Sequence, residues 1–251
     1  MQKELHILEN YFPDKRDGVV VECGTAEGNH MPSIYMEREL GWKFIGFEID
    51  PRFWPILLKN RPNGLNINLA LSDKNEFTDF VVTAWGGNSS LELSEEHKEE
   101  LISYKKTFPI GTFFEKIKVS SITWKTFIKT YKIPHIDFLI LDVEGCEMRV
   151  LNGMKECNIL PDVIQIEFGY ADPTNTLRNE QTKEDFSGFV LIKHKLEEMG
   201  YQFDYVYFND AFFSKIEFWN NKGKPLNWVW EDEEFKWNGY IRYNKEKCRN
   251  L

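Results

Sequence analysis

The chain has 251 residues, of which 42% are hydrophobic, enough for one large packed domain or a domain with an appendage. Its formal net charge of -9 argues against nucleic acid as a partner, because nucleic acid is normally bound through clustered lysine and arginine. No apolar stretch approaches the roughly 20 residues of a membrane-spanning helix, and the first residues lack the features of a signal peptide. A soluble protein located in the cytoplasm is therefore expected.

Short apolar runs alternate with helical patterns from Gly18 to about Phe168. This alternation is typical of a parallel sheet covered by helices on both faces, so the sequence predicts an α/β fold. The predicted strands of this sheet are residues 18–23, 43–49, 65–71, 135–142 and 162–168.

An insertion is expected between the third and fourth of these strands. It consists of a more polar strand at residues 77–85, a Gly-Gly-Asn-Ser-Ser turn and a charged helix near residues 93–106. Helical spacing with a serine at its start then predicts a helix over residues 121–133.

The last part of the chain is expected to close the domain and then change character. A helix is predicted at residues 188–199, followed by two antiparallel strands within residues 201–219. We expect a catalytic domain at residues 1–218 and a tryptophan-rich extension at residues 219–251 packed on it. The extension could instead be a substrate lid or the contact of a homo-oligomer.

The first strand ends near Glu22 and leads into Gly24 and Gly28, which precede a helical segment. Glycine permits close backbone approach, and a helix N-terminus presents free N–H groups and a partial positive charge to a ligand. The dinucleotide fingerprint needs a further glycine, so a nicotinamide cofactor is disfavoured. Glu48 ends the second strand, where a carboxylate can accept both hydroxyl protons of an adenosine ribose. S-adenosylmethionine fits this pattern, although both acids could instead be ordinary strand-end residues that face solvent.

Five segments, ECGTAEG, GFEIDP, LALSD, GGNSSL and IDFLILDVEGCEMRVLNG, resemble those of the FkbM-type S-adenosylmethionine-dependent methyltransferases. The resemblance covers roughly residues 11–214, and its most specific part is the D-V-E-G-x-E block with the later Leu151 and Gly153. It implies a Rossmann-like class I methyltransferase fold with a mostly parallel seven-stranded sheet. The cofactor-binding residues expected from these segments are Glu22, Cys23, Gly24, Gly28, Asn29, Glu48, Ile49, Ser72 and Asp142.

In the strand order implied by that fold, Asp142 and Glu167 end adjacent strands, so both could approach the point where a methyl acceptor would sit. They could hold Mg²⁺ through oxygen ligands, or one of them could act as a general base without a metal. Asp142 could also merely cap the helix beginning near Cys146, but we favour a catalytic role. Glu147, in the first turn of that helix, is expected to be structural, and Glu144 is left open between acceptor binding and a buried hydrogen-bonding role.

His30 follows the glycine loop and is a second candidate base, with a solvent-facing histidine as the equal alternative. The resemblance places Ser89 and Ser90 near the site, and these serines are expected to bind the acceptor together with Tyr170. The resemblance also implies methyl transfer to a hydroxyl of a carbohydrate, either a surface polysaccharide or a sugar nucleotide. A macrolide- or lipid-like acceptor and a non-catalytic cofactor-binding assembly protein are the alternatives.

Overall fold

Seven strands form the main sheet of the computed structural model, in the order β11-β12-β8-β7-β1-β2-β3. The structure describes residues 11–13, 15–30, 32–84, 86–93, 95–104, 114–168, 178–179, 184–185, 187–207 and 210–219. Its strands are β1 (Val19–Cys23), β2 (Lys43–Phe47), β3 (Leu65–Ile67), β4 (Ala70–Ser72), β5 (Glu76–Thr83), β6 (Phe114–Thr123), β7 (Phe138–Leu141), β8 (Val163–Glu167), β9 (Arg178–Asn179), β10 (Glu184–Asp185), β11 (Tyr201–Tyr207) and β12 (Asp210–Lys215). Its helices are α2 (Ser33–Leu40), α3 (Trp54–Asn60), α4 (Glu95–Tyr104), α5 (Trp124–Tyr131), α6 (Glu147–Met154), α7 (Ser187–Glu198) and the short 3-10 turns η1 (Gly86–Asn88) and η2 (Ile216–Phe218).

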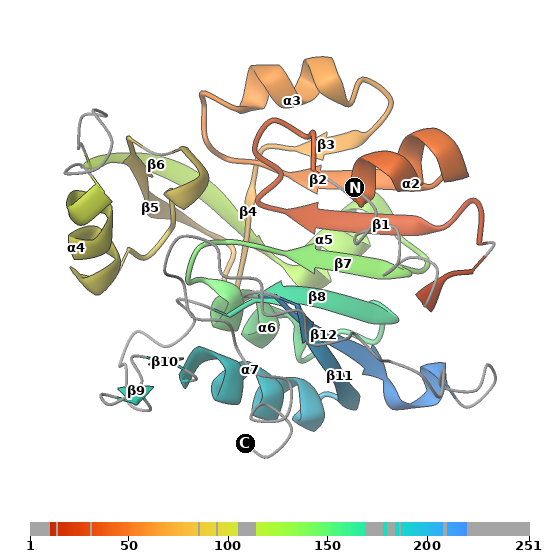
Figure 1. Cartoon of the computed structure of the whole chain (residues 1–251). Helices are drawn as coiled ribbons and strands as arrows, with labels where there is room; N and C mark the ends of the chain where they lie inside the picture. The colour runs from red at the N-terminus through yellow and green to blue at the C-terminus, as the bar shows by residue number, and fades with distance from the viewer. Residues whose placement is uncertain are drawn as a thin grey trace.

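The main sheet is mostly parallel. β1 pairs in parallel with β2 and β7, β7 with β8, and β2 with β3, whereas β12 runs antiparallel to both β8 and β11. The carboxyl ends of β1, β2, β7 and β8 therefore meet at one edge of the sheet (Figure 1). The predicted seven-stranded α/β architecture is confirmed.

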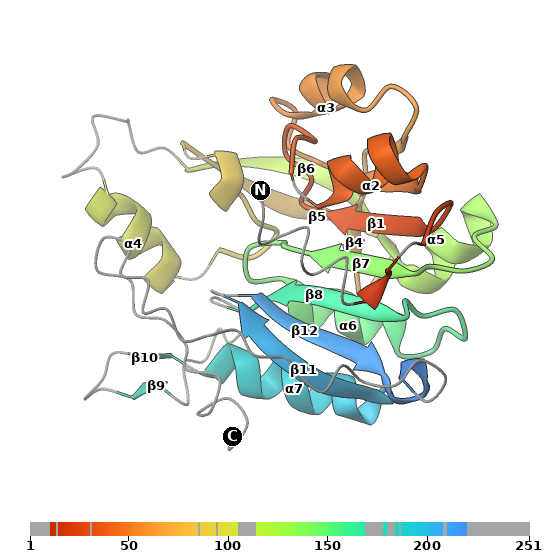
Figure 2. The same cartoon turned by 45° about the vertical axis from the view of Figure 1, so that its right-hand side comes forward.

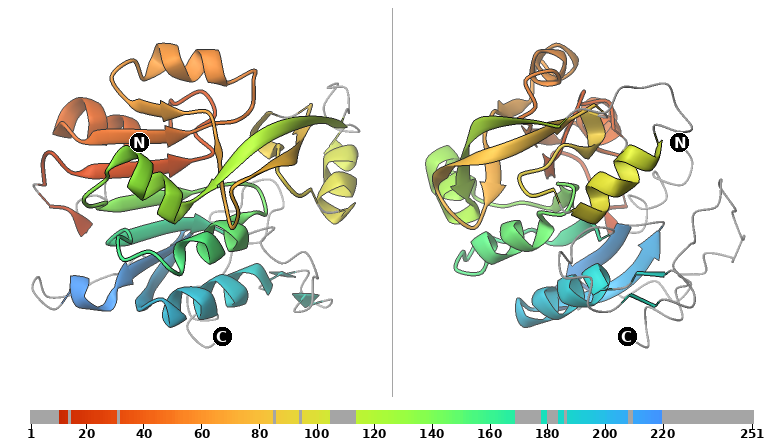
Figure 3. Two further views of the ribbon diagram at one scale, coloured as in Figure 1. Left: turned by 180° about the vertical axis from the view of Figure 1, so that it is seen from behind. Right: turned by 90° about the vertical axis from the view of Figure 1, so that its left-hand side faces the viewer.

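Helices cover both faces of this sheet, which explains why its central strands are mostly apolar. Successive strand residues point to opposite faces, so Val21 packs in the core under α5, α6 and α7, whereas Val20 packs with Met36 of α2 and Leu57 of α3. The first group of helices lies in front of the sheet on the left of Figure 3, and α2 lies on the opposite face in Figure 2.

A second sheet, β4-β6-β5, lies with α4 beyond the carboxyl ends of the main strands (Figure 1, Figure 3). The expectation of one strand over residues 65–71 is wrong, because the chain leaves the main sheet after β3. At that break the side-chain amide of Asn68 donates to the backbone carbonyl of Glu48 over 2.7 Å, and β4 then pairs with β6. The turn in the chain is thus fixed by a side-chain hydrogen bond that periodicity does not reveal.

The predicted helix start at Ser121 is also wrong. Ser121 lies in β6, a strand that the sequence analysis did not predict and that pairs with β5 along its length. The helix α5 begins after Thr123, whose Oγ1 accepts a hydrogen bond from the backbone N–H of Thr126, as an N-cap residue does. The expected alternation of strands and helices fails from β3 to β5, where three strands follow one another with no helix between them.

The N-terminal part of the described chain and its last residue pack together on the sheet. The ring centroids of Tyr11 and Trp219 lie 5.5 Å apart, and the indole N–H of Trp219 donates to Oγ of Ser214 over 2.7 Å. Residues 220–251 lie outside the described residues, so the separate tryptophan-rich extension stays a prediction. Within the described part of the chain, no helix combines the length and the apolar character needed to cross a membrane.

Candidate active site

The loop after β1 requires glycine at both predicted positions. Gly24 has a φ of +81°, and a Cβ atom there would lie 1.8 Å from the backbone oxygen of Asp142. Gly28 has a φ of +72°, and its Cβ would lie 2.6 Å from Cδ1 of Leu57. Both the left-handed backbone and the close contacts exclude a larger side chain. The loop is therefore held tightly against the end of β7 and the helix α3.

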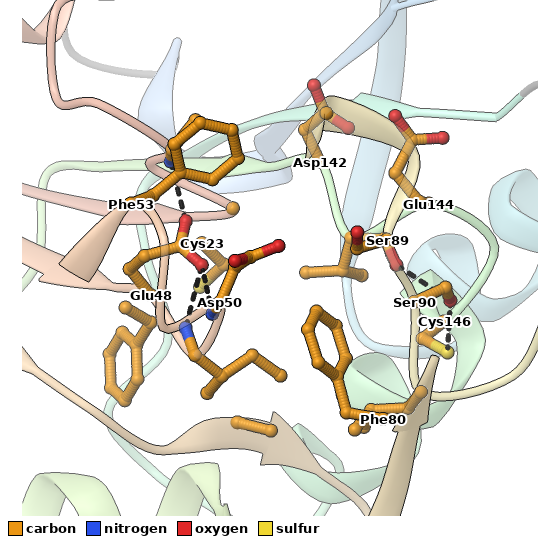
Figure 4. A pocket seen from close by; sticks show the side chains of 18 of the residues that line it. Cys23, Glu48, Asp50, Phe53, Phe80, Ser89, Ser90, Asp142, Glu144 and Cys146 are labelled. Carbon is orange, nitrogen blue, oxygen red and sulfur yellow. Dashed lines mark hydrogen bonds between the residues drawn. The ribbon is translucent and has the colours of Figure 1, made fainter. Parts of the chain in front are cut away.

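Glu48 fastens this loop to the end of β2. Its Oε2 accepts a hydrogen bond from the backbone N–H of Ala26 at 2.6 Å, and its Oε1 accepts from those of Ile49 and Asp50 at 2.8 and 2.7 Å (Figure 4). Burial raises the pKa of Glu48 to about 7, even though these three N–H groups favour the ionised carboxylate. The side chain is thus a buried acid at the predicted ribose position.

Arg61 is a buried residue of this region that the sequence analysis missed. Its guanidinium donates to the carbonyl of Gly28 at 2.5 Å and to Oγ of Ser33 at 2.7 Å, and it pairs with Glu37 at 2.7 Å. It also lies over the ring of Phe44, 4.2 Å from the centroid. Nothing in the local sequence distinguishes this arginine from a solvated charge at a helix end, so only the structure identifies it as a support of the glycine loop.

A cavity of about 340 Å³ lies at the carboxyl edge of the sheet. Glu48 and Asp50 lie on one side of it, and Asp142 and Glu144 lie on the other (Figure 4). The predicted site residues that line it are Cys23, Gly24, His30, Glu48, Ile49, Ser89, Ser90, Asp142 and Glu144. Glu22, Gly28, Asn29, Ser72 and Glu167 are not among its lining residues, and Tyr170 lies outside the described residues. Residues expected to bind cofactor and residues expected to bind acceptor thus share one cavity.

Asp142 and Glu167 form the carboxyl pair that the strand order predicts. Burial, followed by the charges of Asp142, Glu144 and Glu147 and by the hydrogen bond to Asp142, raises the pKa of Glu167 well above its usual range. Burial also raises the pKa of Asp142, while its hydrogen bond with Glu167 opposes the shift. The hydrogen bond between the two carboxyl groups therefore raises the pKa of Glu167 and lowers that of Asp142, which favours Glu167 as the donor of the pair.

Asp210 is a further acid at this edge that the sequence analysis missed. It is the register partner of Glu167 across β12 and β8, and burial and the charge of Asp142 raise its pKa to about 7. Only the antiparallel return of β12 brings it beside the two acids, because it follows them by more than forty residues. One oxygen each of Asp142, Glu144 and Glu167 lie within 4.8 Å of one another.

His30 lies at the mouth of the cavity beside Glu22. The distance from its Nδ1 to Oε1 of Glu22 is 3.3 Å, and the histidine side chain is 55% exposed whereas that of Glu22 is buried. The hydrogen bond with Glu22 raises the pKa of His30 against the opposing effect of burial. Among the described residues, Oε2 of Glu22 has no hydrogen-bond partner. This buried, incompletely paired oxygen is what a cationic ligand beside the glycine loop would satisfy.

The turn after β5 reaches the carboxylates from the small sheet. The side-chain amide of Asn88 donates to Oε1 of Glu144 over 3.3 Å, and Oγ of Ser90 lies 3.4 Å from Sγ of Cys146. Glu144 has a φ of +53°, which is unusual for a residue other than glycine and is concentrated at functional sites. The turn therefore holds Glu144 at the cavity. The sequence alone left the role of Glu144 open between acceptor binding and a buried hydrogen-bonding role.

Glu147 has the structural position that the sequence predicts. It is buried, and its Oε1 accepts hydrogen bonds from the backbone N–H groups of Val143 and Gly145 at 3.0 and 3.3 Å. A second contact explains the later glycine of the D-V-E-G-x-E segment, since a Cβ on Gly153 would lie 2.2 Å from the backbone oxygen of Ser72. These contacts stabilise the loop that carries Asp142.

The mostly parallel seven-stranded sheet with helices on both faces is the class I methyltransferase fold. A family described as the methyltransferase FkbM domain matches residues 22–203, which is more than half of the chain, so the chain belongs to this family. The resemblance found in the sequence is therefore confirmed.

Several solved structures are similar to this chain at low identity. TrmK of M. capricolum, in complex with S-adenosyl-homocysteine, is 11% identical with a TM-score of 0.41, over 86% of this chain and 69% of that one. Precorrin-6y C5,15-methyltransferase of Geobacter metallireducens is 9% identical with a TM-score of 0.41, over 84% and 86%. Fibrillarin of Aeropyrum pernix, with bound S-adenosyl-L-methionine, is 14% identical with a TM-score of 0.43, over 84% and 72%. Values this low indicate neither the reaction nor the substrate of this chain, and no curated protein matches it.

Proposed function

We propose that this protein transfers the methyl group of S-adenosylmethionine to a hydroxyl oxygen of a carbohydrate. The observation that carries the proposal is the single cavity that Glu48 and the glycine loop line on one side and Asp142 on the other. A methyl donor bound by the first side and an acceptor bound by the second would share this one cavity. This arrangement supports direct transfer between two ligands in one site.

The cofactor side has the groups that S-adenosylmethionine requires. In this proposal the ionised Glu48 accepts hydrogen bonds from the ribose hydroxyls, and the ligand lies beside Gly24, which lines the cavity after the end of β1. The buried carboxylate of Glu22 offers negative charge to the cationic end of the cofactor. Glu22, Asn29 and Ser72 stay predictions as direct contacts, because none of the three lines the cavity.

The reaction needs alignment and a destination for one proton. The acceptor oxygen attacks the methyl carbon, the carbon–sulfur bond breaks, its electron pair stays on sulfur, and the hydroxyl proton passes to Asp142. In this proposal Glu167 is the donor of the hydrogen bond to Asp142, because that bond raises the pKa of Glu167 and lowers that of Asp142, and Asp142 is the member that accepts the proton. Alignment of two reactants can lower the barrier by about 7–11 kcal/mol, so the shape of the cavity matters as much as the base.

Mg²⁺ is the alternative use of the same acids. The donor set fits a hard cation, because Asp142, Glu144 and Glu167 each bring an oxygen within 4.8 Å of the others. A bound Mg²⁺ would polarise the acceptor hydroxyl and lower its pKa. A metal ion bound by both Asp142 and Glu167 would have to displace the proton of Glu167. His30, paired with Glu22, is the second candidate base.

The family resemblance and the polar residues on one side of the cavity support a carbohydrate as the acceptor. Ser89, Ser90 and Glu144 supply hydroxyl and carboxylate groups there, which suit a polyhydroxyl ligand better than a lipid-like one. A macrolide- or lipid-like acceptor stays the alternative, as does a cofactor-binding assembly protein that catalyses nothing. The cytoplasmic location and the homo-oligomer also stay predictions.

Two measurements with the full chain test this function. Calorimetric titration with S-adenosyl-homocysteine should show binding at one site, whereas binding of NAD or no binding of either ligand would contradict the cofactor assignment. Turnover of methyl-labelled S-adenosylmethionine with neutral glycosides, sugar nucleotides, macrolides and long-chain alcohols should give labelled glycoside ethers. Cofactor binding without turnover of any acceptor would favour the assembly protein.

A further inference from the structure

Arg52 begins a chain of contacts that crosses the cavity. Its backbone N–H and its Nε each donate to Oδ1 of Asp50 over 2.9 Å, and its Nη2 lies 2.5 Å from Oδ2 of the same carboxylate. Asp50 is buried, and its own backbone N–H donates to Glu48. The guanidinium is therefore fixed by a bidentate ion pair next to the proposed ribose acid.

The same guanidinium also contacts the end of β5 and the turn that follows it. Nη1 donates to the backbone carbonyl of Thr83 at 2.8 Å, and Nη2 donates to Oγ of Ser89 at 3.2 Å. The hydroxyl oxygen of Ser89 also accepts from the backbone N–H of Thr83 at 3.1 Å, which closes the turn on itself. A planar guanidinium with several donors in fixed directions can make these contacts at once, whereas a lysine ammonium cannot.

The other end of the turn is fastened to the loop that carries Asp142. Oγ of Ser90 lies 3.5 Å from the carbonyl of Val143, and Asn88 donates to Glu144. The turn therefore spans the cavity between the end of β2 and the loop after β7. The attachment of the turn to the segment after β2 depends on the side chain of Arg52, whereas the attachment to the loop after β7 does not.

We propose that Arg52 is a positioning residue that holds the turn of residues 86–90 in place as the acceptor-binding wall of the cavity. It acts through Ser89 and the backbone of Thr83, not by touching the reacting atoms. The inference rests on the proposed function, because its first test measures the kinetic constants for the acceptor. Its second readout, the protection of backbone amides in the turn, does not need an acceptor.

Three variants and one matched control test the inference. Arg52→Gln removes the ion pair and both contacts to the turn, Arg52→Lys keeps a positive charge beside Asp50 without the planar fork, and Ser89→Ala removes one receiving group. Arg38→Gln is the control, because Arg38 donates to a backbone carbonyl of Asn60 over 3.2 Å at an exposed position away from the cavity. Each variant is measured for melting temperature, affinity for S-adenosyl-homocysteine, acceptor KM and kcat, and amide hydrogen exchange.

Arg52→Gln should raise the acceptor KM about tenfold or more, the usual effect of a lost charge-assisted hydrogen bond, with kcat and cofactor affinity within about twofold. The peptide covering residues 84–92 should exchange faster in this variant but not in Arg38→Gln. In the double variant with Ser89→Ala, the two KM effects should be less than additive, because both act on one contact. Arg52→Lys should restore little of the loss.

Unchanged exchange in residues 84–92 with Arg52→Gln would overturn the inference even if no acceptor is known. An equal loss of cofactor affinity and acceptor affinity would also overturn it, because Arg52 would then support the cofactor side. If Arg52→Gln does not fold, Arg52→Lys and Ser89→Ala decide the question by the same two readouts. Failure of the unchanged protein to turn over any acceptor would contradict the proposed function and leave the exchange test standing.

Discussion

Glu48 should make cofactor binding depend on pH in the neutral range. In the ligand-free protein burial raises its pKa to about 7, so the carboxyl is partly protonated near neutrality. Ribose hydroxyls donate to the ionised form, so cofactor binding must release this proton. Replacement of Glu48 by glutamine removes the titration while it keeps the size of the side chain.

The size of the effect follows from the pKa. A group with a pKa of about 7 is roughly nine-tenths ionised at pH 8 and one-tenth ionised at pH 6, so the dissociation constant of S-adenosyl-homocysteine should be about tenfold higher at pH 6 than at pH 8. Glu48→Gln should weaken binding at pH 8 by about 100-fold, since two hydrogen bonds to a carboxylate are lost at about 1.5 kcal/mol or more each. An amide nitrogen would also face the N–H of Ala26 or of Asp50, which now donate to Glu48.

Through Glu48, the stability of the ligand-free protein should fall as pH rises, whereas its affinity for the cofactor should rise. The folded pKa of Glu48 lies above its ordinary value of 4.5, so the folded state keeps a proton that the unfolded state releases between these two pH values. The contribution of Glu48 to stability is therefore lost as pH rises through about 7. Relative to the unchanged protein, the melting temperature of Glu48→Gln should rise between about pH 5 and pH 8.

Calorimetric titration at about pH 6 and pH 8, in buffers with different ionisation enthalpies, measures both affinity and released protons. The unchanged protein should release a fraction of a proton, and Glu48→Gln should release less. His30, whose pKa is also raised, is present in both proteins, so the difference between them reports Glu48. The same pH dependence in both proteins would refute the assignment of this acid to the ribose.

Three further predictions concern the acids and the glycine loop. Asp142→Asn should lower kcat by about 10² to 10⁴, the usual contribution of a general base, and full activity in a labelled-methyl assay would remove Asp142 from catalysis. Removal of divalent cations with EDTA should leave turnover intact if Asp142 and Glu167 share a proton, and activity restored only by added Mg²⁺ would establish the metal alternative. Gly24→Ala should destabilise the fold by about 2–5 kcal/mol in denaturant unfolding, because it combines a positive φ with a contact to the Asp142 carbonyl. Gly200→Ala, with a φ of +88° and open space around it, should cost only about 1–2 kcal/mol, and equal losses in the two variants would refute the packing argument.

The main sheet could be predicted because its central strands are buried on both faces. β7 is a continuous apolar run and β1 is apolar up to Glu22, and such runs separated by helical patterns indicate parallel pairing. The small sheet could not be predicted as readily, because only one residue of β6 is buried and its charged residues do not stand out from those of a surface helix. The break between β3 and β4 depends on the side chain of Asn68, whose partner is twenty residues away.

The residues of the candidate site likewise fall into those that the sequence could predict and those that it could not. Glu48 and Asp142 could be predicted because they end buried strands, and strand ends meet at one edge of a parallel sheet. Arg52, Arg61 and Asp210 could not, because each acquires its role from a contact between distant segments. From the sequence alone, an arginine near a helix end is expected to be solvated. Only a structure shows the buried carbonyl or carboxylate that it contacts.

The contact between Gly24 and Asp142 links the two halves of the proposed reaction. Gly24 has no Cβ, and the backbone carbonyl of Asp142 lies in the space where a Cβ would be. The backbone N–H of Asp142 donates in turn to the carbonyl of Cys23 at 3.1 Å, so the ends of β1 and β7 are fixed to each other on both sides of this residue. A methyl donor seated on the loop and a base carried by Asp142 would therefore keep a constant separation set by backbone atoms. Side chains that bind the acceptor could then vary on the turn after β5 without disturbing the geometry of transfer.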